Sequence, residues 1–75
     1  MALKDFEYDI LRGRAWGHCV RCVWSFYVGG EPVTREVRTL QKRGHVSITY
    51  YAGLKAGVNA TDIGRKRLEF MNNQE

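Results

Sequence analysis

The chain has 75 residues, a formal net charge of +4 at pH 7 and a hydrophobic fraction of 44%. A chain of this length buries only about 60% of its unfolded surface, so all of its apolar side chains must share one core. We therefore predict a single domain over residues 1–75. The two Trp, four Tyr and three Phe residues exclude a disordered chain, and no apolar stretch approaches the length of a membrane span.

The first ten residues and the two cysteines indicate in which cellular compartment the protein is expected. The segment 1–10 holds three acidic residues and no continuous apolar run, so it does not resemble a secretory signal. Cys19 and Cys22 are the only cysteines, and on an extended strand their side chains would leave opposite faces, which disfavours a disulfide between them. Two free thiols suit a reducing compartment, and we expect a cytoplasmic protein.

The first predicted element is a half-buried strand over Asp5–Leu11. Apolar and acidic side chains alternate along this segment, and a period of two is typical of a strand with one buried face. The apolar face would consist of Phe6, Tyr8 and Ile10. The acidic face would consist of Asp5, Glu7 and Asp9, spaced about 7 Å apart. We interpret the acidic face as solvated rather than as a cation site or a pair of catalytic carboxylates.

The strongest pattern in the chain predicts a long central strand over His18–Val28. Its core face would consist of Val20, Cys22, Trp24, Phe26 and Val28. The following Gly29-Gly30-Glu31-Pro32 predicts a hairpin connection, because paired glycines supply positive φ. Pro32 cannot donate to a central ladder, so the next strand, Val33–Leu40, is predicted at a sheet edge, with Arg35 breaking its alternation.

The remaining segments predict one more strand and a helix. Gln41–Gly44 is expected to turn the chain, and His45–Tyr51 is rich in the β-branched and aromatic residues that favour a fourth strand. The glycines at positions 53 and 57 predict a loop or one helical turn over residues 52–60. Thr61 and Asp62 are good N-cap residues for a helix over Ile63–Asn73, although Arg67 falls inside the apolar face of that helix.

Together these elements predict an α+β fold, in which a C-terminal helix packs on one face of a four-stranded antiparallel meander. The C-terminal residues also fit a fifth strand, with Leu68 and Phe70 inward and Arg67 and Glu69 outward. That alternative gives a small five-stranded barrel of the SH3 or OB type. The N-cap residues and the length of the segment favour the helix.

Catalytic and metal chemistry find little support in the sequence. The residue types of a tetrahedral zinc site are present as His18, Cys19, Cys22 and His45. Structural zinc sites place Cys-x-x-Cys on a tight knuckle, whereas Cys22 here continues into the predicted strand without a turn residue. We therefore expect no metal and no cofactor. The sequence also has no phosphate-binding glycine motif and no suggestive spacing of Ser, His and an acid, so we do not predict an enzyme.

Basic and aromatic residues carry the leading functional prediction. If Phe26 and Tyr50 face the core, then Tyr27 and Tyr51 face outward, because successive strand residues alternate. On such sheet surfaces arginines neutralise phosphates and aromatic rings stack on unpaired bases. We predict a regulatory nucleic-acid-binding surface formed by Arg12, Arg14, Trp16, Arg21, Tyr27, Lys42, Arg43 and Tyr51.

Two other interpretations use the same residues. The tyrosines can instead cover the second sheet face against the C-terminal helix, with the arginines as solubilising charges. The competing function is a protein-binding inhibitor or adaptor, of the type that phages and mobile elements encode against a host machine. It would dock through the edge strand Val33–Leu40 or through the aromatic patch, and the same edge would allow a homodimer. A continuous positive groove would favour nucleic acid, and a flat apolar edge would favour protein.

Overall fold

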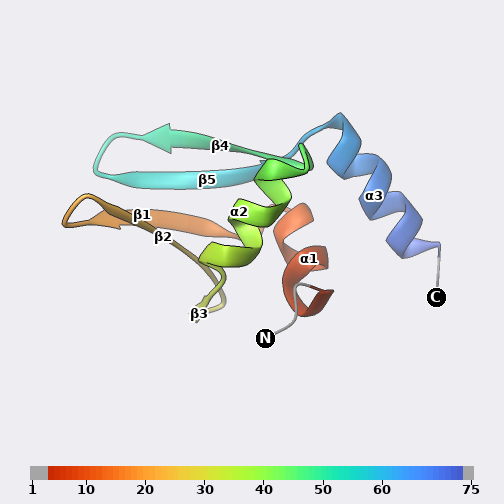
Figure 1. The fold of residues 1–75 in the computed structure, drawn as a ribbon, viewed down its shortest axis with the longest axis horizontal. Helices are drawn as coiled ribbons and strands as arrows, with labels where there is room; N and C mark the ends of the chain where they lie inside the picture. The colour runs from red at the N-terminus through yellow and green to blue at the C-terminus, as the bar shows by residue number, and fades with distance from the viewer. Residues whose placement is uncertain (1–3, 74–75) are drawn as a thin grey trace.

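The computed structural model describes residues 4–73, which fold into three helices and a five-stranded antiparallel sheet (Figure 1). In chain order the elements are α1 (Lys4–Leu11), β1 (Trp16–Val20), β2 (Val23–Val28), β3 (Glu31–Pro32), α2 (Thr34–Lys42), β4 (Val46–Tyr51), β5 (Lys55–Ala60) and α3 (Asp62–Asn72). The strands lie in the order β3-β2-β1-β5-β4. The predicted α+β class is confirmed, and the strand number is that of the five-stranded alternative.

The core lies between the sheet and the helices α1 and α2, while α3 contacts α1 at one end of the sheet (Figure 1). The largest fully buried side chains are those of Ile10, Phe26, Val33, Val37, Leu40 and Val58. They come from both helices and from two strands, so the helices and the sheet depend on one another for burial. None of the three described helices is both long enough and apolar enough to cross a membrane.

The first element is a helix, so the strand predicted over Asp5–Leu11 is wrong. Glu7, Ile10 and Leu11 are buried, and residues three and four positions apart share one face of a helix. Phe6, four positions before Ile10, packs against the core from the same side. In a short segment that alternates apolar and polar residues, some apolar residues are also four positions apart, so the pattern fits a strand as well as a helix. The segment forms a helix that packs against α2 and α3.

The long strand predicted over His18–Val28 is two strands joined by a tight turn. Arg21 and Cys22 form this turn with φ values of 53° and 66°. Positive φ is uncommon for residues other than glycine, asparagine and aspartate, so the sequence carried no turn signal here. The predicted core face is right for Trp24, Phe26 and Val28, because β2 keeps its alternation, and wrong for Val20 and Cys22, which are exposed at the turn.

The edge strand predicted over Val33–Leu40 is the helix α2. Val33, Val37 and Leu40 are completely buried and follow the spacing of one helix face. The hydroxyl oxygen of Thr34 accepts a hydrogen bond from the Phe26 amide at 3.0 Å, which fixes the start of α2 against β2. The broken alternation at Arg35 was the sign of this helix, because Arg35 lies on its exposed side.

The segment predicted as a loop or one helical turn over residues 52–60 contains the inner strand β5. After a turn in which Gly53 and Leu54 have φ values of 83° and 59°, β5 pairs with β4 on one side and with β1 on the other. Ala56 and Val58 are buried at alternate positions. These are small side chains next to glycine, so the strand pattern was weak in the sequence. The predicted strand His45–Tyr51 is confirmed as β4.

The predicted C-terminal helix is confirmed as α3, with Thr61 as its N-cap. The Thr61 hydroxyl accepts a hydrogen bond from the Gly64 amide at 3.1 Å and donates one to the Gly44 carbonyl at 2.6 Å. The Thr61 amide also donates to the His45 carbonyl at 3.0 Å. One residue therefore both begins α3 and fastens it to the turn before β4.

Arg67, which interrupts the apolar face of α3, forms an ion pair with the buried Glu7 of α1. The Nε and Nη2 atoms of Arg67 donate to the two carboxylate oxygens of Glu7 at 3.1 and 3.3 Å. These hydrogen bonds, together with the negative charge of Glu7, raise the pKa of the Arg67 guanidinium above its ordinary value. The pair joins the first helix to the last and explains why a cation is tolerated on the inner face of α3.

Replacing Arg67 with alanine is expected to lower the free energy of unfolding by about 1 to 2 kcal/mol. The substitution leaves the Glu7 carboxylate buried without a partner, but Arg67 is 39% exposed, so the loss is smaller than for a fully buried pair. Urea unfolding measures the effect. Arg65→Ala is the control, because Arg65 and its partner Asp62 are both strongly exposed and the change should stay below about 0.5 kcal/mol. Equal losses in the two variants would contradict this account.

Candidate nucleic-acid interface

Alternation along the strands gives the sheet two unlike faces. Phe26, Val46 and Val58 are buried on the face that α1 and α2 cover. Their neighbours in the sequence point to the other side, which we call the open face. The strand register places on it Trp16, His18 and Val20 of β1, Val23, Ser25 and Tyr27 of β2, Ser47, Thr49 and Tyr51 of β4, and Lys55, Gly57 and Asn59 of β5.

Three rings from β1 and β2 form a cluster on the open face. His18 and Tyr27 stack with ring centroids 5.3 Å apart and an interplanar angle of 10°. Trp16 lies 5.2 Å from Tyr27 and 5.6 Å from His18, tilted by about 30° to each. Trp16 is directly opposite Tyr27 in the strand register, so the sheet itself brings these rings together.

A glycine on β5 brings a fourth ring close to this cluster. Gly57 is paired with Trp16 on one side and with Thr49 on the other, and it has no side chain to separate β1 from β4. A Cβ atom on Gly57 would lie 3.2 Å from Cε2 of Tyr51, so the Tyr51 ring lies across this glycine. The aromatic surface therefore extends from β2 over β1 and β5 to β4.

Cations border the aromatic surface. Lys55, the first residue of β5, is paired with His18 on one side and with Tyr51 on the other, so it lies between these two rings at the hairpin end of the open face. Arg14 precedes β1 and Arg21 follows it, and both are exposed. Arg14 has a weak ion pair with Asp9 at 3.8 Å. Within the described strands no carboxylate side chain lies on the open face, because Glu31 pairs with the inward-facing Val28.

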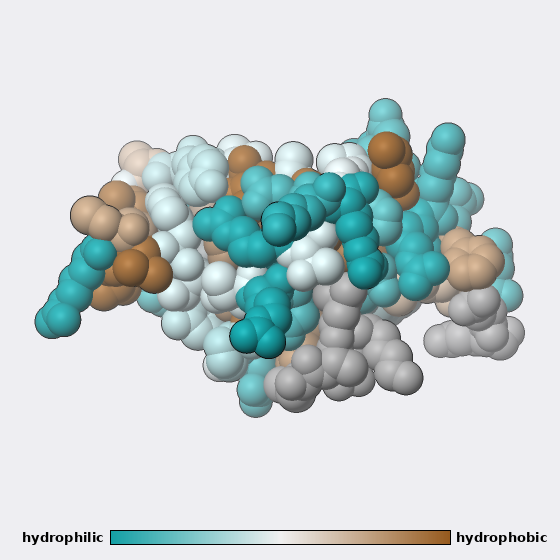
Figure 2. Space-filling view, viewed as in Figure 1, coloured by the Kyte–Doolittle hydropathy of each residue, from teal (hydrophilic) through white to brown (hydrophobic). Residues whose placement is uncertain are grey.

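A second basic surface lies on α2, on the opposite side of the sheet. Opposite its buried residues the helix presents a stripe of Arg35, Arg38 and Lys42, spaced three and four positions apart. We call this stripe, with the adjoining Gln41 and Arg43, the basic face of α2. Figure 2 shows hydrophilic residues over α2 in the middle of the view. Arg38 lies over the edge of the core, 5.3 Å from the Phe26 ring centroid, and donates to Gln41 Oε1 at 3.0 Å.

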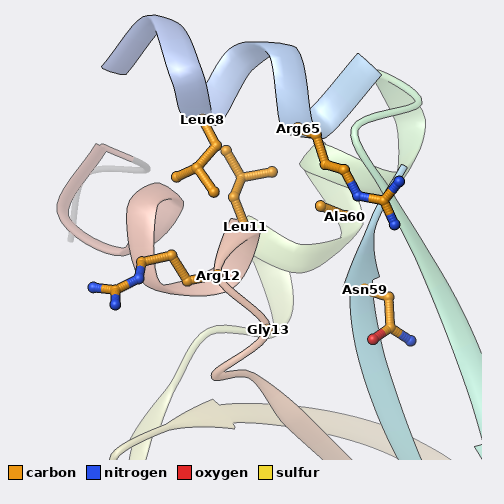
Figure 3. Close-up of a pocket in the computed structure, with 7 residues that line it drawn as sticks. All are labelled: Leu11, Arg12, Gly13, Asn59, Ala60, Arg65 and Leu68. Carbon is orange, nitrogen blue, oxygen red and sulfur yellow. The ribbon is translucent and has the colours of Figure 1, made fainter. Parts of the chain in front are cut away.

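A shallow hollow of about 390 Å³ lies between α1, α3 and β5 (Figure 3). It is lined by Leu11, Arg12, Gly13, Asn59, Ala60, Arg65 and Leu68. The side chains of Arg12 and Arg65 extend in different directions at its rim (Figure 3). Arg65 is paired with Asp62 at 3.0 Å, and Arg12 lies over the Tyr8 ring at 5.2 Å. The two guanidinium groups do not converge on one ligand, so we place no site in this hollow.

The eight residues predicted to bind nucleic acid lie in three places. Trp16, Tyr27 and Tyr51 lie on the open face, with Arg14 and Arg21 at the two ends of β1. Lys42 and Arg43 lie at the end of α2, on the helix-covered side, and Arg12 borders the hollow. The fold therefore does not bring all eight residues together on one surface, and their role in binding stays a prediction.

Sequence reasoning missed several members of both surfaces. His18 and Lys55 belong to the open face, whereas Arg35 and Arg38 belong to the basic face of α2. Arg35 and Arg38 were detectable, because cations at these positions alternate with Val33, Val37 and Leu40 at helical spacing. Lys55 had no usable signal, since β5 was not recognised as a strand.

The four residues considered for zinc do not share a site. His18 lies on the open face, Cys19 faces the other side, and Cys22 is exposed in the turn after β1. His45 precedes β4 at the far end of the sheet, beyond the pair Val46 and Ala60. Among the described residues no group of three or more His, Cys, Asp or Glu side chains is placed to hold a metal ion.

Comparison with protein families, with curated proteins and with solved structures found no match for this chain.

Proposed function

We propose that this chain is a small, non-enzymatic regulatory domain that binds double-stranded DNA through the basic face of α2. The observation that carries the proposal is the composition of that helix. One side is completely buried at Val33, Val37 and Leu40, and the opposite side carries Arg35, Arg38 and Lys42. Cations clustered along the outer side of a helix that is held on a folded core are typical of a helix that enters a groove of nucleic acid.

The dimensions of α2 suit the major groove of DNA. Its nine residues extend about 13 Å, and an α-helix with side chains is about 10 to 12 Å wide. The major groove of B-form DNA is about 12 Å wide, whereas that of an RNA duplex is deep and too narrow for side chains to read. This favours DNA over duplex RNA as the partner of α2.

The side chains of the basic face fit both kinds of DNA contact. Arg35, Lys42 and Arg43 are exposed and can contact phosphate oxygens. Arginine and glutamine side chains can also form paired hydrogen bonds with base edges, and Gln41 is an exposed glutamine on this face. Glu36 is the single acidic residue within α2, so the helix attracts a polyanion. We place this activity in the cytoplasm, where the two free cysteines stay reduced.

The double variant Arg35→Ala with Lys42→Ala is expected to bind duplex DNA at least about tenfold more weakly than the parent chain. Fluorescence anisotropy of a labelled duplex of about 20 base pairs measures this affinity at low salt. The matched control is Arg65→Ala with Lys66→Ala, which removes the same charge from exposed positions of α3. If both double variants lose affinity equally, the effect comes from net charge and the proposed role of α2 is wrong.

A second candidate function is binding to a protein partner, as an inhibitor or adaptor of the type that phages and mobile elements encode. Exposed apolar residues at the tips of the two hairpins favour it, namely Val20, Val23 and Leu54. Figure 2 shows hydrophobic residues gathered at this end of the molecule. The segment Val33–Leu40, predicted as an edge strand for docking, cannot serve in this way because it belongs to the helix α2. If no oligonucleotide binds at low salt, this candidate replaces the first.

A further inference from the structure

We infer that the open face is a second nucleic-acid site, which stacks the unpaired bases of a single strand on Trp16, His18, Tyr27 and Tyr51. The inference rests on the proposed function in one respect, namely that this domain binds nucleic acid. It adds a different ligand, an unpaired strand in place of a duplex. It also adds a different location, on the side of the sheet away from α2.

The exposure of these rings is what requires an explanation. Trp16 is 47% exposed and Tyr51 is 57% exposed, although large aromatic side chains on a sheet usually have a second layer to cover them. Here α1 and α2 both pack on the other face. Trp16, His18 and Tyr27 pack against each other instead, stacked or tilted, at centroid distances of 5.2 to 5.6 Å, and the Tyr51 ring lies across Gly57. They therefore present a firm apolar platform to solvent.

The charge around the platform selects the ligand. An aromatic surface that served a protein segment would require no particular sign of charge, but this one has Lys55 between His18 and Tyr51 and the exposed Arg21 directly after β1. Arg14, before β1, adds a third cation, which Asp9 of α1 partly neutralises. No carboxylate of the described strands opposes them on this face. Stacking rings bordered by cations are the chemistry that holds unpaired nucleotides, because the rings take the bases and the cations take the phosphates.

The size of the platform suits a short single strand. It crosses four neighbouring strands, which corresponds to about 14 Å at the usual strand spacing. Gly57 keeps its centre shallow, since any larger residue there would displace the Tyr51 ring. Two or so consecutive bases can therefore lie across the rings while their phosphates remain near Lys55.

A pair of tyrosines in β4 provides a sharp test. Tyr51 lies on the open face, whereas Tyr50 lies on the opposite face with its ring centroid 4.9 Å from that of Trp24 in an edge-to-face arrangement. The two residues are neighbours in the same strand and are similarly exposed, at 57% and 54%. Replacing each with alanine therefore makes the same chemical change on opposite sides of the sheet.

The experiment uses the change in tryptophan fluorescence on titration with an oligothymidylate of about eight nucleotides. The background is Trp24→Phe, which leaves Trp16 as the single tryptophan, because the chain has two. Stacking on Trp16 is expected to quench its emission. Tyr51→Ala should weaken the affinity about tenfold, and Tyr50→Ala should change it less than about twofold. Thermal unfolding of each variant confirms that it is folded before it is titrated.

The outcomes separate this inference from the proposed function. Loss of oligothymidylate binding in Tyr51→Ala alone supports the open face as the site. Binding that neither tyrosine affects, or that Arg35→Ala with Lys42→Ala abolishes instead, overturns it and assigns the single strand to α2. Duplex binding without any oligothymidylate binding also overturns it, while the role of α2 stands. If neither nucleic acid binds, both proposals fail.

Discussion

Replacing Gly64 with alanine is expected to destabilise the domain by about 2 kcal/mol or more. A Cβ atom on Gly64 would overlap the carbonyl oxygen of His45, which is backbone and cannot rotate away. Both sides of this contact are held in place, because Thr61 bonds to the carbonyls of Gly44 and His45 and also caps α3 at the Gly64 amide. Relief of the overlap would therefore require separation of α3 from the turn before β4.

The expected loss of stability is opposite to the change that helix propensity alone predicts. Alanine is favoured over glycine inside a helix by about 1 kcal/mol, so helix propensity alone predicts that Gly64→Ala raises stability. Thermal unfolding followed by circular dichroism should instead show a melting temperature lowered by about 8 to 16 °C. Lys66→Ala, at an exposed position of the same helix, should change the stability by no more than about 0.5 kcal/mol. A rise in melting temperature for Gly64→Ala would show that α3 is not fastened at this contact.

The second large effect concerns salt. If α2 and its flanking residues neutralise about four phosphates, the logarithm of the duplex affinity should fall with a slope near −3.6 against the logarithm of salt concentration. Raising the salt from about 50 to about 200 mM should then weaken binding about 150-fold. The number four corresponds to Arg35, Arg38, Lys42 and Arg43, the cations in and directly after α2.

The same titration shows which cationic side chains contact phosphates and so displace counterions from the DNA. In Arg35→Ala with Lys42→Ala the slope should become shallower by about 2, because two phosphate contacts are lost. In Arg65→Ala with Lys66→Ala it should stay unchanged. An affinity that does not depend on salt in the parent chain would contradict a phosphate-contacting role for α2, whatever the affinity itself is.

The strand and turn assignments show where the sequence was informative. The range of β4 and the range and N-cap of α3 were predicted almost completely, because β-branched residues and the N-cap Thr61 are local signals. The turn at Arg21 and Cys22 was not predictable, since neither residue type favours positive φ. The strand pairing on both sides holds this turn in a conformation that the local sequence does not indicate.

The two helices that were predicted as strands failed for a related reason. In α1 and α2 the apolar residues are few, and spacings of two, three and four positions occur together in such short segments. The choice between the period of a strand and the period of a helix depends on tertiary contacts, namely the ion pair of Glu7 with Arg67 and the hydrogen bond of Val33 with Phe26. The sequence does not show which residues of other elements will make these contacts. Periodicity therefore identified the apolar residues but not the element that buries them.

The candidate site was predictable to the extent that it depends on alternation. Tyr27 and Tyr51 lie on the open face, as the pattern around Phe26 and Tyr50 indicates. The grouping of Tyr51 with Trp16 depends on β5 lying between β1 and β4, which follows from the topology and not from any local pattern. Tyr27 meets Trp16 through the pairing of β1 with β2, which was hidden by the unpredicted turn at Arg21 and Cys22. The strand predicted over Val33–Leu40 would place Arg35 and Arg38 on opposite faces, so the basic face of α2 is visible only once this segment is known to be a helix. That these surfaces bind nucleic acid stays a prediction.

The most direct test of the central claim is a titration of the isotopically labelled chain with duplex DNA, followed by the backbone amide signals in NMR spectra. We expect the largest shifts in α2 and its end, at Arg35, Arg38, Gln41, Lys42 and Arg43, with little change at the exposed residues of α3. Shifts confined to the open face or to α3, with α2 unchanged, would contradict the proposal that α2 enters the DNA groove.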